Sequence, residues 1–422
     1  MSRHVVVMVT TSYPRFPGDT VGTFMEPIAK GIAARGHEVH LVAPWHPLIT
    51  RAAEEGGVHF HFFRYAPVRS LNVFGYAAAL EADVRLRRAA WLAAPLAVAA
   101  GWRLARRVAQ RSGATVMHGH WVVPGGVIAD LAAGGRPLVV SLHGSDVYVA
   151  ERHGLAAAAA RRVFRRAAWV TACSADLRDR AVALGARPDR TSVVPYGVDT
   201  ARFKPDEAAR AGERARLGVD EGGALVFAVG RLVRKKGFEY LLEATARLAE
   251  RRPAVTLALA GGGDLDEELR RRAATLGIAG RVRFLGTVAQ DRVPALLAAA
   301  DVAAVPSVRD DQGNVDGLPN VVMEALASGT PLVATPAGGI AQVVEDGETA
   351  LVVPERDAAA LAGAIEALLG DPDRRAAMGR RARALVEARY TWARTAADFD
   401  AVYDRVAGRA STDPPPHRAA AS

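Results

Sequence analysis

Short apolar runs alternate along the chain with longer segments of helical spacing. Residues 5–9 form a β-branched run, residues 10–22 a loop rich in Pro and Gly, and residues 23–35 a helical pattern before another apolar run at 38–43. This order predicts a strand, loop, helix and strand unit. Further runs follow at 115–117, 137–142, 169–172 and 191–194. The first half therefore predicts an α/β domain with a parallel, doubly wound sheet.

The same alternation restarts after a polar segment near residue 200. Apolar runs recur at residues 224–229, 256–260, 282–285, 302–306, 331–334 and 350–353. We expect Rossmann-like domains at 1–198 and 199–388, a C-terminal helix at 389–408 and a disordered, proline-containing tail at 409–422. Two such domains would place a cleft between the carboxyl ends of their strands, where ligands of these sheets usually bind.

Composition indicates a globular protein of two or three domains, with 422 residues of which half are hydrophobic. The single cysteine, Cys173, excludes an intramolecular disulfide, and no Cys or His cluster has the spacing of zinc ligands. The apolar run at the N-terminus lacks a cleavage site and is too short to span a bilayer. We therefore expect a cytoplasmic protein without a structural metal.

The positive charge lies in the first half of the chain. Residues 1–198 hold 24 Lys and Arg against 13 Asp and Glu, a net charge of +11, whereas residues 199–422 carry −2. Such asymmetry indicates an anionic partner for the N-terminal domain. The interleaved aromatic and basic motifs of nucleic-acid binding are absent, so no nucleic acid is expected and an anionic membrane surface is the preferred partner.

Residues 85–111 are the most basic segment. They contain no acid and seven arginines around an apolar centre with two tryptophans: Arg85, Arg87, Arg88, Arg103, Arg106, Arg107, Arg111, Trp91 and Trp102. The composition resembles an interfacial membrane anchor, and a helix packed on the sheet with a solvated basic face is the alternative. The apolar stretch is too short to span a bilayer and contains Pro95, which would kink it.

Three histidines fall near predicted strand ends. His118 and His120 lack a third metal ligand nearby, which argues against a metal site. His143 directly follows the strand at 137–142, so its ring should point into the cleft, where an imidazole could contact a sugar hydroxyl. A structural histidine is the alternative.

Glycines and cations follow the first strand of each domain. Gly18 and Gly22 could let backbone N–H groups approach a phosphate, although a plain turn has the same composition. Arg231 ends the first strand of the second domain, and Lys235 and Lys236 open the next helix. A planar guanidinium and a mobile ammonium together suit a diphosphate leaving group. The glycines at 261–263 fit a ligand loop or a tight turn equally well.

Two carboxylates eight positions apart mark residues 310–339. Asp316 stands in a glycine-containing loop, and Glu324 lies about one turn into a helix that Pro319 and Asn320 can start. Asp316 can face a ligand at the positive N-terminal end of that helix, while Glu324 is fixed well enough to hold sugar hydroxyls. Solvated acids on an amphipathic helix are the alternative.

The ordered series of these motifs resembles the family-4 retaining glycosyltransferases of GT-B architecture, from His4 to about Val406. The series consists of Gly22-Thr23, Arg35-Gly36-His37-Glu38-Val39, His120-Trp121, His143-Gly144-Ser145-Asp146, Pro195-Tyr196-Gly197-Val198-Asp199, Gly230-Arg231-Leu232, Lys236-Gly237, Phe284-Leu285-Gly286, Pro306-Ser307 and the paired-acid segment. The resemblance implies transfer of a sugar from a nucleotide sugar, held by the C-terminal domain, to an acceptor held by the N-terminal domain. It also implies retained anomeric configuration, no required metal or cofactor, and a last helix that crosses back onto the N-terminal domain.

The resemblance also implies roles for individual residues. Arg231 and Lys236 would bind the donor diphosphate, with Gly22 and Thr23 approaching it from the other domain, and Glu324 would bind the ribose. Asp316 and the backbone of Gly317, Leu318, Pro319, Asn320 and Val321 would meet the donor sugar and phosphate, His143 would lie beside the reacting sugar, and Val288 would contact the base.

Asp316 departs from the family pattern, which has Glu at both ends of the pair, so its reach to the donor sugar is shorter by one methylene. The expected acceptor is a glycan or a lipid-linked molecule in glycolipid or cell-surface polysaccharide synthesis, on the inner face of the cytoplasmic membrane. A sugar-nucleotide epimerase of the same fold and a non-catalytic nucleotide-sugar-binding protein are the alternatives.

Overall fold

The chain forms two compact α/β units. The structure, a computed structural model, describes residues 2–66, 72–76, 88–252 and 254–408. The first unit comprises residues 1–196 together with the C-terminal segment from Trp392, and the second comprises residues 197–391. The expected tail at 409–422 and the arginines Arg85 and Arg87 lie outside the described residues.

The sheet of the first unit has eight strands in the order β3-β4-β2-β1-β5-β6-β7-β8. Every pairing is parallel except that of β3 with β4. The strands are β1 Val5–Val9, β2 Glu38–Pro44, β3 Glu54–Glu55, β4 Val58–Phe63, β5 Val116–His120, β6 Leu138–Leu142, β7 Trp169–Ala172 and β8 Thr191–Val193. The apolar runs predict six of these strands, whereas β3 and β4 were not predicted, because histidines interrupt the apolar residues of β4.

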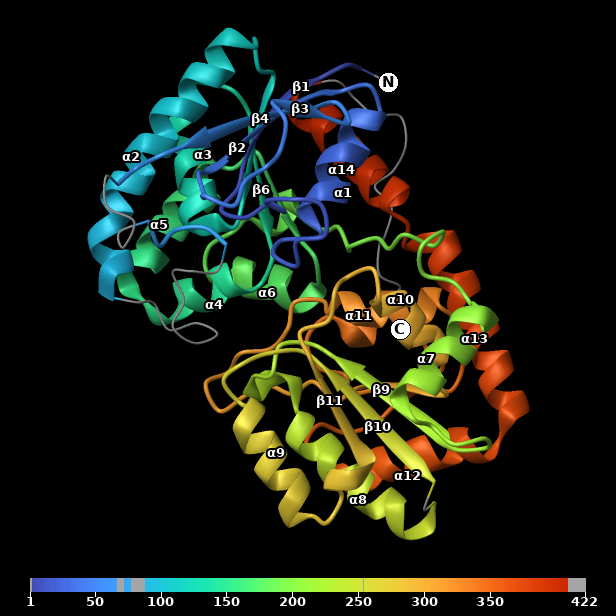
Figure 1. Cartoon of the computed structure of the whole chain (residues 1–422). Coiled ribbons are helices and arrows are strands. Elements are labelled where there is room, and N and C mark those ends of the chain that lie inside the picture. The colour runs from blue at the N-terminus through green and yellow to red at the C-terminus, as the bar shows by residue number, and fades with distance from the viewer. Residues whose placement is uncertain (1, 67–71, 77–87, 253, 409–422) are drawn as a thin grey trace. The chain divides into compact units, whose positions relative to one another are not determined.

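Helices cover both faces of this sheet (Figure 1). They are α1 Met25–Ala34, α2 Arg88–Arg111, α3 Val127–Ala132, α4 Ser145–Arg152, α5 Gly154–Arg166, α6 Ala175–Ala183 and α14 Trp392–Val406. Helix α2 continues through Pro95. A side chain on Gly101 of α2 would meet Phe63 of β4 and Ile128 of α3, so these elements pack closely.

The second unit has a six-stranded parallel sheet in the order β11-β10-β9-β12-β13-β14. Its strands are β9 Ala224–Val229, β10 Val255–Ala260, β11 Val282–Gly286, β12 Val302–Val305, β13 Leu332–Ala334 and β14 Leu351–Val352. Its helices are α7 Glu207–Leu217, α8 Phe238–Arg251, α9 Asp266–Thr275, α10 Val293–Ala299, α11 Asn320–Ala327, α12 Ala358–Gly370 and α13 Pro372–Arg389. Buried apolar residues of α8, α9 and α12 form one core with the sheet.

The C-terminal helix α14 belongs to the first unit and packs along α1 (Figure 1). A side chain on Gly31 of α1 would lie 3.1 Å from Ala396 of α14, so the two helices need a small residue there. Polar bonds reinforce the contact, because Asp400 accepts from Arg35 at 2.6 Å and lies 3.0 Å from His37 Nε2. The helix is therefore held by an ion pair as well as by apolar packing.

We predict that Asp400→Asn destabilises the first unit by about 1–3 kcal/mol, because it removes the charge that Arg35 and His37 share at a nearly buried position. Urea unfolding at pH 7 measures the change. Asp179→Asn is the control, since its exposed carboxylate pairs with exposed Arg178 and should change stability by less than about 0.5 kcal/mol. Equal stability of both variants would contradict the role of Asp400.

Candidate active site

The strand order of the second unit reverses between β9 and β12. Ligands of open parallel sheets bind at the carboxyl ends of the strands where the order reverses. The segment with Arg231, Lys235 and Lys236 leaves the carboxyl end of β9, and the segment that reaches Asp316 leaves the carboxyl end of β12. The predicted donor residues of these two loops therefore meet at the expected position of the sheet.

A tight turn at Gly237 joins the two loops. Gly237 has φ +64°, and a side chain there would collide with the carbonyl oxygen of Pro306, 2.0 Å from the Cβ position. The backbone N–H of Val308 donates to the carbonyl of Lys235 at 2.8 Å. These contacts fix the short 3₁₀ turn Arg234–Lys236 against the loop after β12.

Asp316 lies between two lysines. Its Oδ1 is 3.2 Å from Lys235 Nζ and its Oδ2 is 2.5 Å from Lys236 Nζ, and all three side chains are at most 14% exposed. Burial would raise the pKa of Asp316, but the charges of Lys236 and Lys235 outweigh burial and hold that pKa well below its usual range. Asp316 is thus a carboxylate at any physiological pH.

Glu324 lies on α11 in a different environment. Burial raises the pKa of Glu324 to about 7, and the positive charges of Arg202 and Lys236 offset only part of that effect. Helix α11 begins at Asn320, directly after Pro319. Its N-terminal N–H groups and positive dipole end favour an anion beside Asp316.

The other predicted donor residues differ in what they can offer. Leu318 and Val321 have buried side chains, so a ligand would meet only their backbone, as it would at Gly317 and Pro319. Arg231 is exposed at the end of β9. Val288 is partly buried in the loop after β11, at the edge of the sheet. Arg202 donates a hydrogen bond to the carbonyl oxygen of Gln290 in the same loop.

The glycines at 261–263 pack against the loop after β9. A side chain on Gly261, which has φ +143°, would lie 1.8 Å from the carbonyl oxygen of Gly230, and one on Gly263 would lie 2.4 Å from that of Leu232. Close backbone approach accounts for these glycines, which supports the tight-turn alternative.

In the first unit the strand order reverses between β1 and β5, and the glycine loop follows β1. Arg15 and Asp19 brace this loop with two side-chain bonds of 2.6 and 2.8 Å. Gly22 has φ +67°, and a Cβ atom there would lie 3.0 Å from the hydroxyl oxygen of Ser12. Gly22 also starts the turn into α1, because its carbonyl accepts from Met25 N–H at 2.9 Å. Thr23 lies in this turn and is partly buried.

His143 follows β6 and is held through both ring nitrogens. Nδ1 lies 2.7 Å from the hydroxyl of Tyr196, and Nε2 lies 3.0 Å from Nδ1 of His120. Burial keeps the pKa of His143 well below its usual range, with a smaller contribution from His120. Phe24 stacks on Tyr196 at 4.7 Å and contacts the His143 ring at 4.8 Å. His143 is therefore a neutral imidazole in an aromatic cluster.

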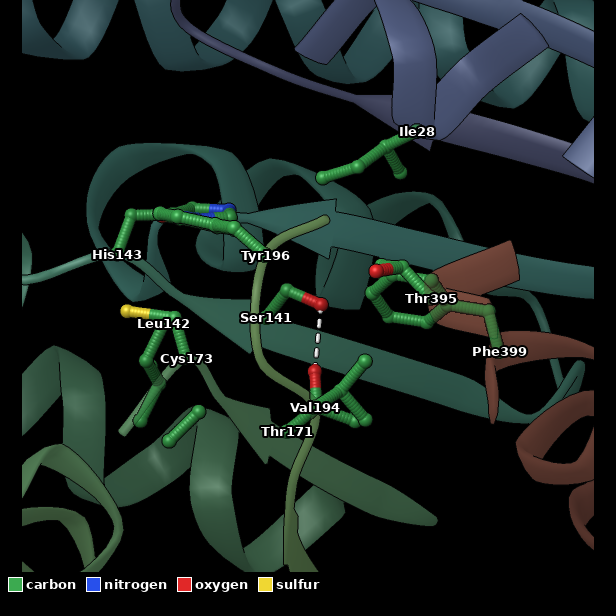
Figure 2. Close-up of a pocket in the computed structure, with 11 residues that line it drawn as sticks. Ile28, Ser141, Leu142, His143, Thr171, Cys173, Val194, Tyr196, Thr395 and Phe399 are labelled. Atoms are coloured by element: carbon green, nitrogen blue, oxygen red, sulfur yellow. Dashed lines mark hydrogen bonds between the residues drawn. The ribbon is translucent and has the colours of Figure 1, made fainter. Parts of the chain in front are cut away.

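Figure 2 shows His143 beside Tyr196 at one end of a small pocket between the ends of β6 and β7 and helix α14. The pocket has a volume of about 10 Å³, which is room for about one water molecule. Ser141 and Thr171 bond to each other at 2.6 Å at its floor. This pocket is therefore too small to bind a sugar.

His118 lies within β5 and is fully buried. Its ring nitrogens lie 2.7 Å from the hydroxyls of Tyr403 and Ser141. Within residues 2–66, 72–76, 88–252 and 254–408, no group of three His, Cys, Asp or Glu side chains is arranged to hold a metal ion. His118 thus serves the contact between the sheet and α14.

The structure brings Asp316 and Lys236 together. The positive charge of Lys236 also offsets part of the effect of burial on the pKa of Glu324. Sequence reasoning gave no role to Lys235 as a partner of Asp316, to Arg202 near Glu324, or to Tyr196 as a partner of His143. Two consecutive lysines before a glycine were the only signal for Lys235.

We predict that Glu324→Gln gains stability relative to the wild type as the pH rises. A raised folded pKa means that ionisation of Glu324 costs stability between its ordinary pKa near 4.5 and about 7. The difference between variant and wild type should be small at pH 4 and reach about 1–3 kcal/mol at pH 8. Urea unfolding from pH 4 to pH 8 measures it. Glu348→Gln, at an exposed pair with Arg381, should give a nearly constant difference, and a flat difference for Glu324→Gln would contradict the environment described.

Two family models match this chain. The family model described as Glycosyltransferase Family 4 matches residues 21–202, and the one described as Glycosyl transferases group 1 matches residues 210–385. A GDP-mannose-dependent alpha-(1-6)-phosphatidylinositol monomannoside mannosyltransferase of Mycolicibacterium smegmatis is 38% identical over 280 residues, which are 66% of this chain and 72% of that protein. A D-inositol 3-phosphate glycosyltransferase of Nocardia farcinica is 41% identical over 219 residues, 50% of this chain and 47% of that protein.

Solved structures share the fold. Anabaena Alr3699/HepE in complex with UDP superposes with a TM-score of 0.75 at 23% identity, over 95% of this chain and 100% of that one. Sucrose-phosphate synthase from Thermosynechococcus elongatus superposes with a TM-score of 0.76 at 21% identity, over 97% of this chain and 100% of that one. The two α/β units and these matches lead to one conclusion: the chain belongs to the family-4 glycosyltransferases and has the GT-B fold.

Proposed function

We propose that this glycosyltransferase moves a sugar from a nucleoside diphosphate sugar, bound by the second unit, to an acceptor bound by the first, with retained anomeric configuration and without a metal. The observation that carries the proposal is the buried Asp316 carboxylate between Lys235 and Lys236 at the β9/β12 reversal. A family-4 chain with that charge arrangement has the groups that a diphosphate leaving group needs.

The leaving diphosphate is the centre of the proposed mechanism. Negative charge grows on the diphosphate as the bond to the sugar breaks, so cations placed at that position stabilise the transition state more than the ground state. Arg231, Lys236 and the N–H groups at the start of α11 supply this stabilisation. Glu324 accepts hydrogen bonds from the ribose hydroxyls, and Val288 contacts the base.

Asp316 and His143 would act near the sugar. Asp316 is ionised and so can accept hydrogen bonds from sugar hydroxyls, with the shorter reach of Asp. His143 is neutral, and a direct bond from its ring to the sugar requires it to release Tyr196 or His120. Gly22 and Thr23 bring the start of α1 to the phosphate.

Transfer is favoured over the two alternatives. Family membership and the names of the relatives both describe glycosyl transfer, whereas an epimerase would need a further acid and base pair in the site. The names of two relatives contain phosphatidylinositol monomannoside and D-inositol 3-phosphate. We include an inositol phosphate or a lipid-linked glycan among the acceptors that this chain uses, in glycolipid or cell-surface polysaccharide synthesis.

The first unit would bind the membrane surface peripherally. None of the helices in the described part of the chain has the length and apolar character to span a bilayer. Helix α2 exposes Leu92 at 75% and Leu96 at 48%, and its later turns expose Arg103, Arg106 and Arg107. Exposed leucines in the first half of the helix and exposed arginines in the second fit an interfacial helix that inserts apolar side chains among anionic lipids. We therefore propose that the enzyme works on the inner face of the cytoplasmic membrane, on a lipid-linked acceptor.

We predict acceptor-dependent release of nucleoside diphosphate from one donor of a panel of nucleotide sugars, with a product of the donor's anomeric configuration by NMR. Arg231→Ala combined with Lys236→Ala should lower turnover by about 10³-fold or more, because two charge-assisted contacts of about 1.5–3 kcal/mol each are lost. Arg251→Ala, at an exposed pair with Glu366, is the control. Epimerised donor without acceptor, an inverted product or near-normal turnover of the double variant would each refute part of the proposal.

We predict that the protein floats with anionic liposomes at moderate salt and that Leu92→Ser with Leu96→Ser reduces the bound fraction about tenfold or more. The reason is that each buried leucine contributes about 1.5–3 kcal/mol. Leu48→Ser removes another exposed leucine, 52% exposed in the loop after β2, and should leave flotation unchanged. If the wild type ignores anionic liposomes, the membrane proposal fails.

A further inference from the structure

Lys235 and Lys236 are consecutive, yet both reach the same carboxylate. Lys235 Nζ meets Oδ1 of Asp316 and Lys236 Nζ meets Oδ2. Lysine is rarely buried unless it is paired, and the Lys235 side chain is only 11% exposed. One carboxylate is thus clamped by two cations, although a single cation would already neutralise it.

The surroundings of the two lysines differ. The side chain of Lys236 passes the end of β9, where a Cβ on Gly230 would lie 3.2 Å from Lys236 Cε. Its charge also lowers the pKa of Glu324 on α11. Lys236 therefore passes the end of β9, pairs with Asp316 and acts electrostatically on Glu324. Lys235, in contrast, is tied to the loop after β12, because its carbonyl accepts from Val308 N–H and its ammonium pairs with Asp316.

We propose that Lys235 is a positioning residue, the permanent counter-ion of Asp316, which keeps that carboxylate ionised and oriented when Lys236 turns to the donor diphosphate. This inference rests on the proposed function and extends it to a residue outside the resemblance. It gives the two lysines separate roles: Lys236 binds donor and Lys235 acts through Asp316.

The charge balance shows why a second lysine is useful. The charged groups around Asp316 are Lys235 and Lys236 from the turn, with Glu324 from α11 competing for Lys236. A diphosphate would draw Lys236 away from Asp316. Without Lys235, the nearly buried Asp316 would lose its second cation as well, and it would take up a proton or turn aside. With Lys235 in place, the carboxylate oxygens of Asp316 stay directed at the sugar.

The test compares Lys235→Met with Lys235→Arg and Lys236→Met. We expect Lys235→Met to lower kcat about tenfold to hundredfold with little change in donor KM, whereas Lys236→Met both lowers kcat and raises donor KM. Lys235→Arg should restore most of kcat because it keeps the charge. Arg234→Met removes an exposed cation of the same turn that pairs with Glu268, and it should match the wild type.

Two readouts separate positioning from mere support of the fold. In the Asp316→Asn background, Lys235→Met should cause little further loss of kcat, because its effect passes through the Asp316 charge. The second readout is rescue: Lys235→Arg restores the positive charge beside Asp316 and should restore kcat, whereas a variant that merely damages packing would not be rescued by a larger side chain. Additive losses in the double variant, or no rescue by Lys235→Arg, would overturn the proposal.

A measurement without substrate keeps this result distinct from the proposed function. Urea unfolding of ligand-free wild type, Lys235→Met, Asp316→Asn and the double variant gives the coupling between the two side chains. The coupling should be present at pH 7 and decline as the pH falls below about 4, where unfolded aspartates take up protons. Absence of coupling overturns the pairing even if transfer is observed. Coupling without transfer from any donor refutes the proposed function alone.

Discussion

Parallel pairing is the constraint on which the rest of this structure depends. Every strand of the second unit, and all but the short β3 of the first, pairs in parallel, so the chain must return across the sheet after each strand. The loops that leave the carboxyl ends therefore gather on one edge of each sheet. Residues as distant in sequence as Lys235 and Asp316 meet there because β9 and β12 are neighbours. The charged groups of the candidate site therefore meet although they are far apart in sequence.

Within that edge, burial and neighbouring charge give the two carboxylates opposite properties. Both Asp316 and Glu324 are withdrawn from water, which disfavours their charged forms. Two lysines overcome this effect at Asp316, whereas at Glu324 the charges of Arg202 and Lys236 offset only part of it, and the pKa of Glu324 stays raised to about 7. Asp316 therefore carries a charge across the physiological pH range, whereas Glu324 gains one only as the pH rises through neutrality.

The sequence was sufficient for the fold because long apolar runs bounded by glycine and proline identify buried parallel strands. It failed at β4, where His59 and His61 alternate with phenylalanines and conceal the apolar pattern. For the site, motif order located Arg231, Lys236, Asp316 and Glu324, and the structure places Lys236 beside Asp316. Motifs carry no information on which side chain pairs with which, so the bond between His143 and Tyr196 was not predictable.

Tyr196, whose hydroxyl lies 2.7 Å from His143 Nδ1, also lies where the chain leaves the first unit. It is the last residue of the first unit before the chain enters the second, and Trp392 is the first residue after the chain returns. Their rings lie 6.4 Å apart, so both covalent connections leave from one aromatic cluster that also contains Phe24 and His143. Within the second unit, Val198 N–H donates to the carbonyl of Tyr390 at 2.9 Å, which joins the two connections again. A rotation of the backbone at residue 196 would move the hydroxyl that holds His143 Nδ1. Because the hydroxyl of Tyr196 holds this imidazole in place, the position of the His143 ring depends on the backbone conformation at the end of the first unit.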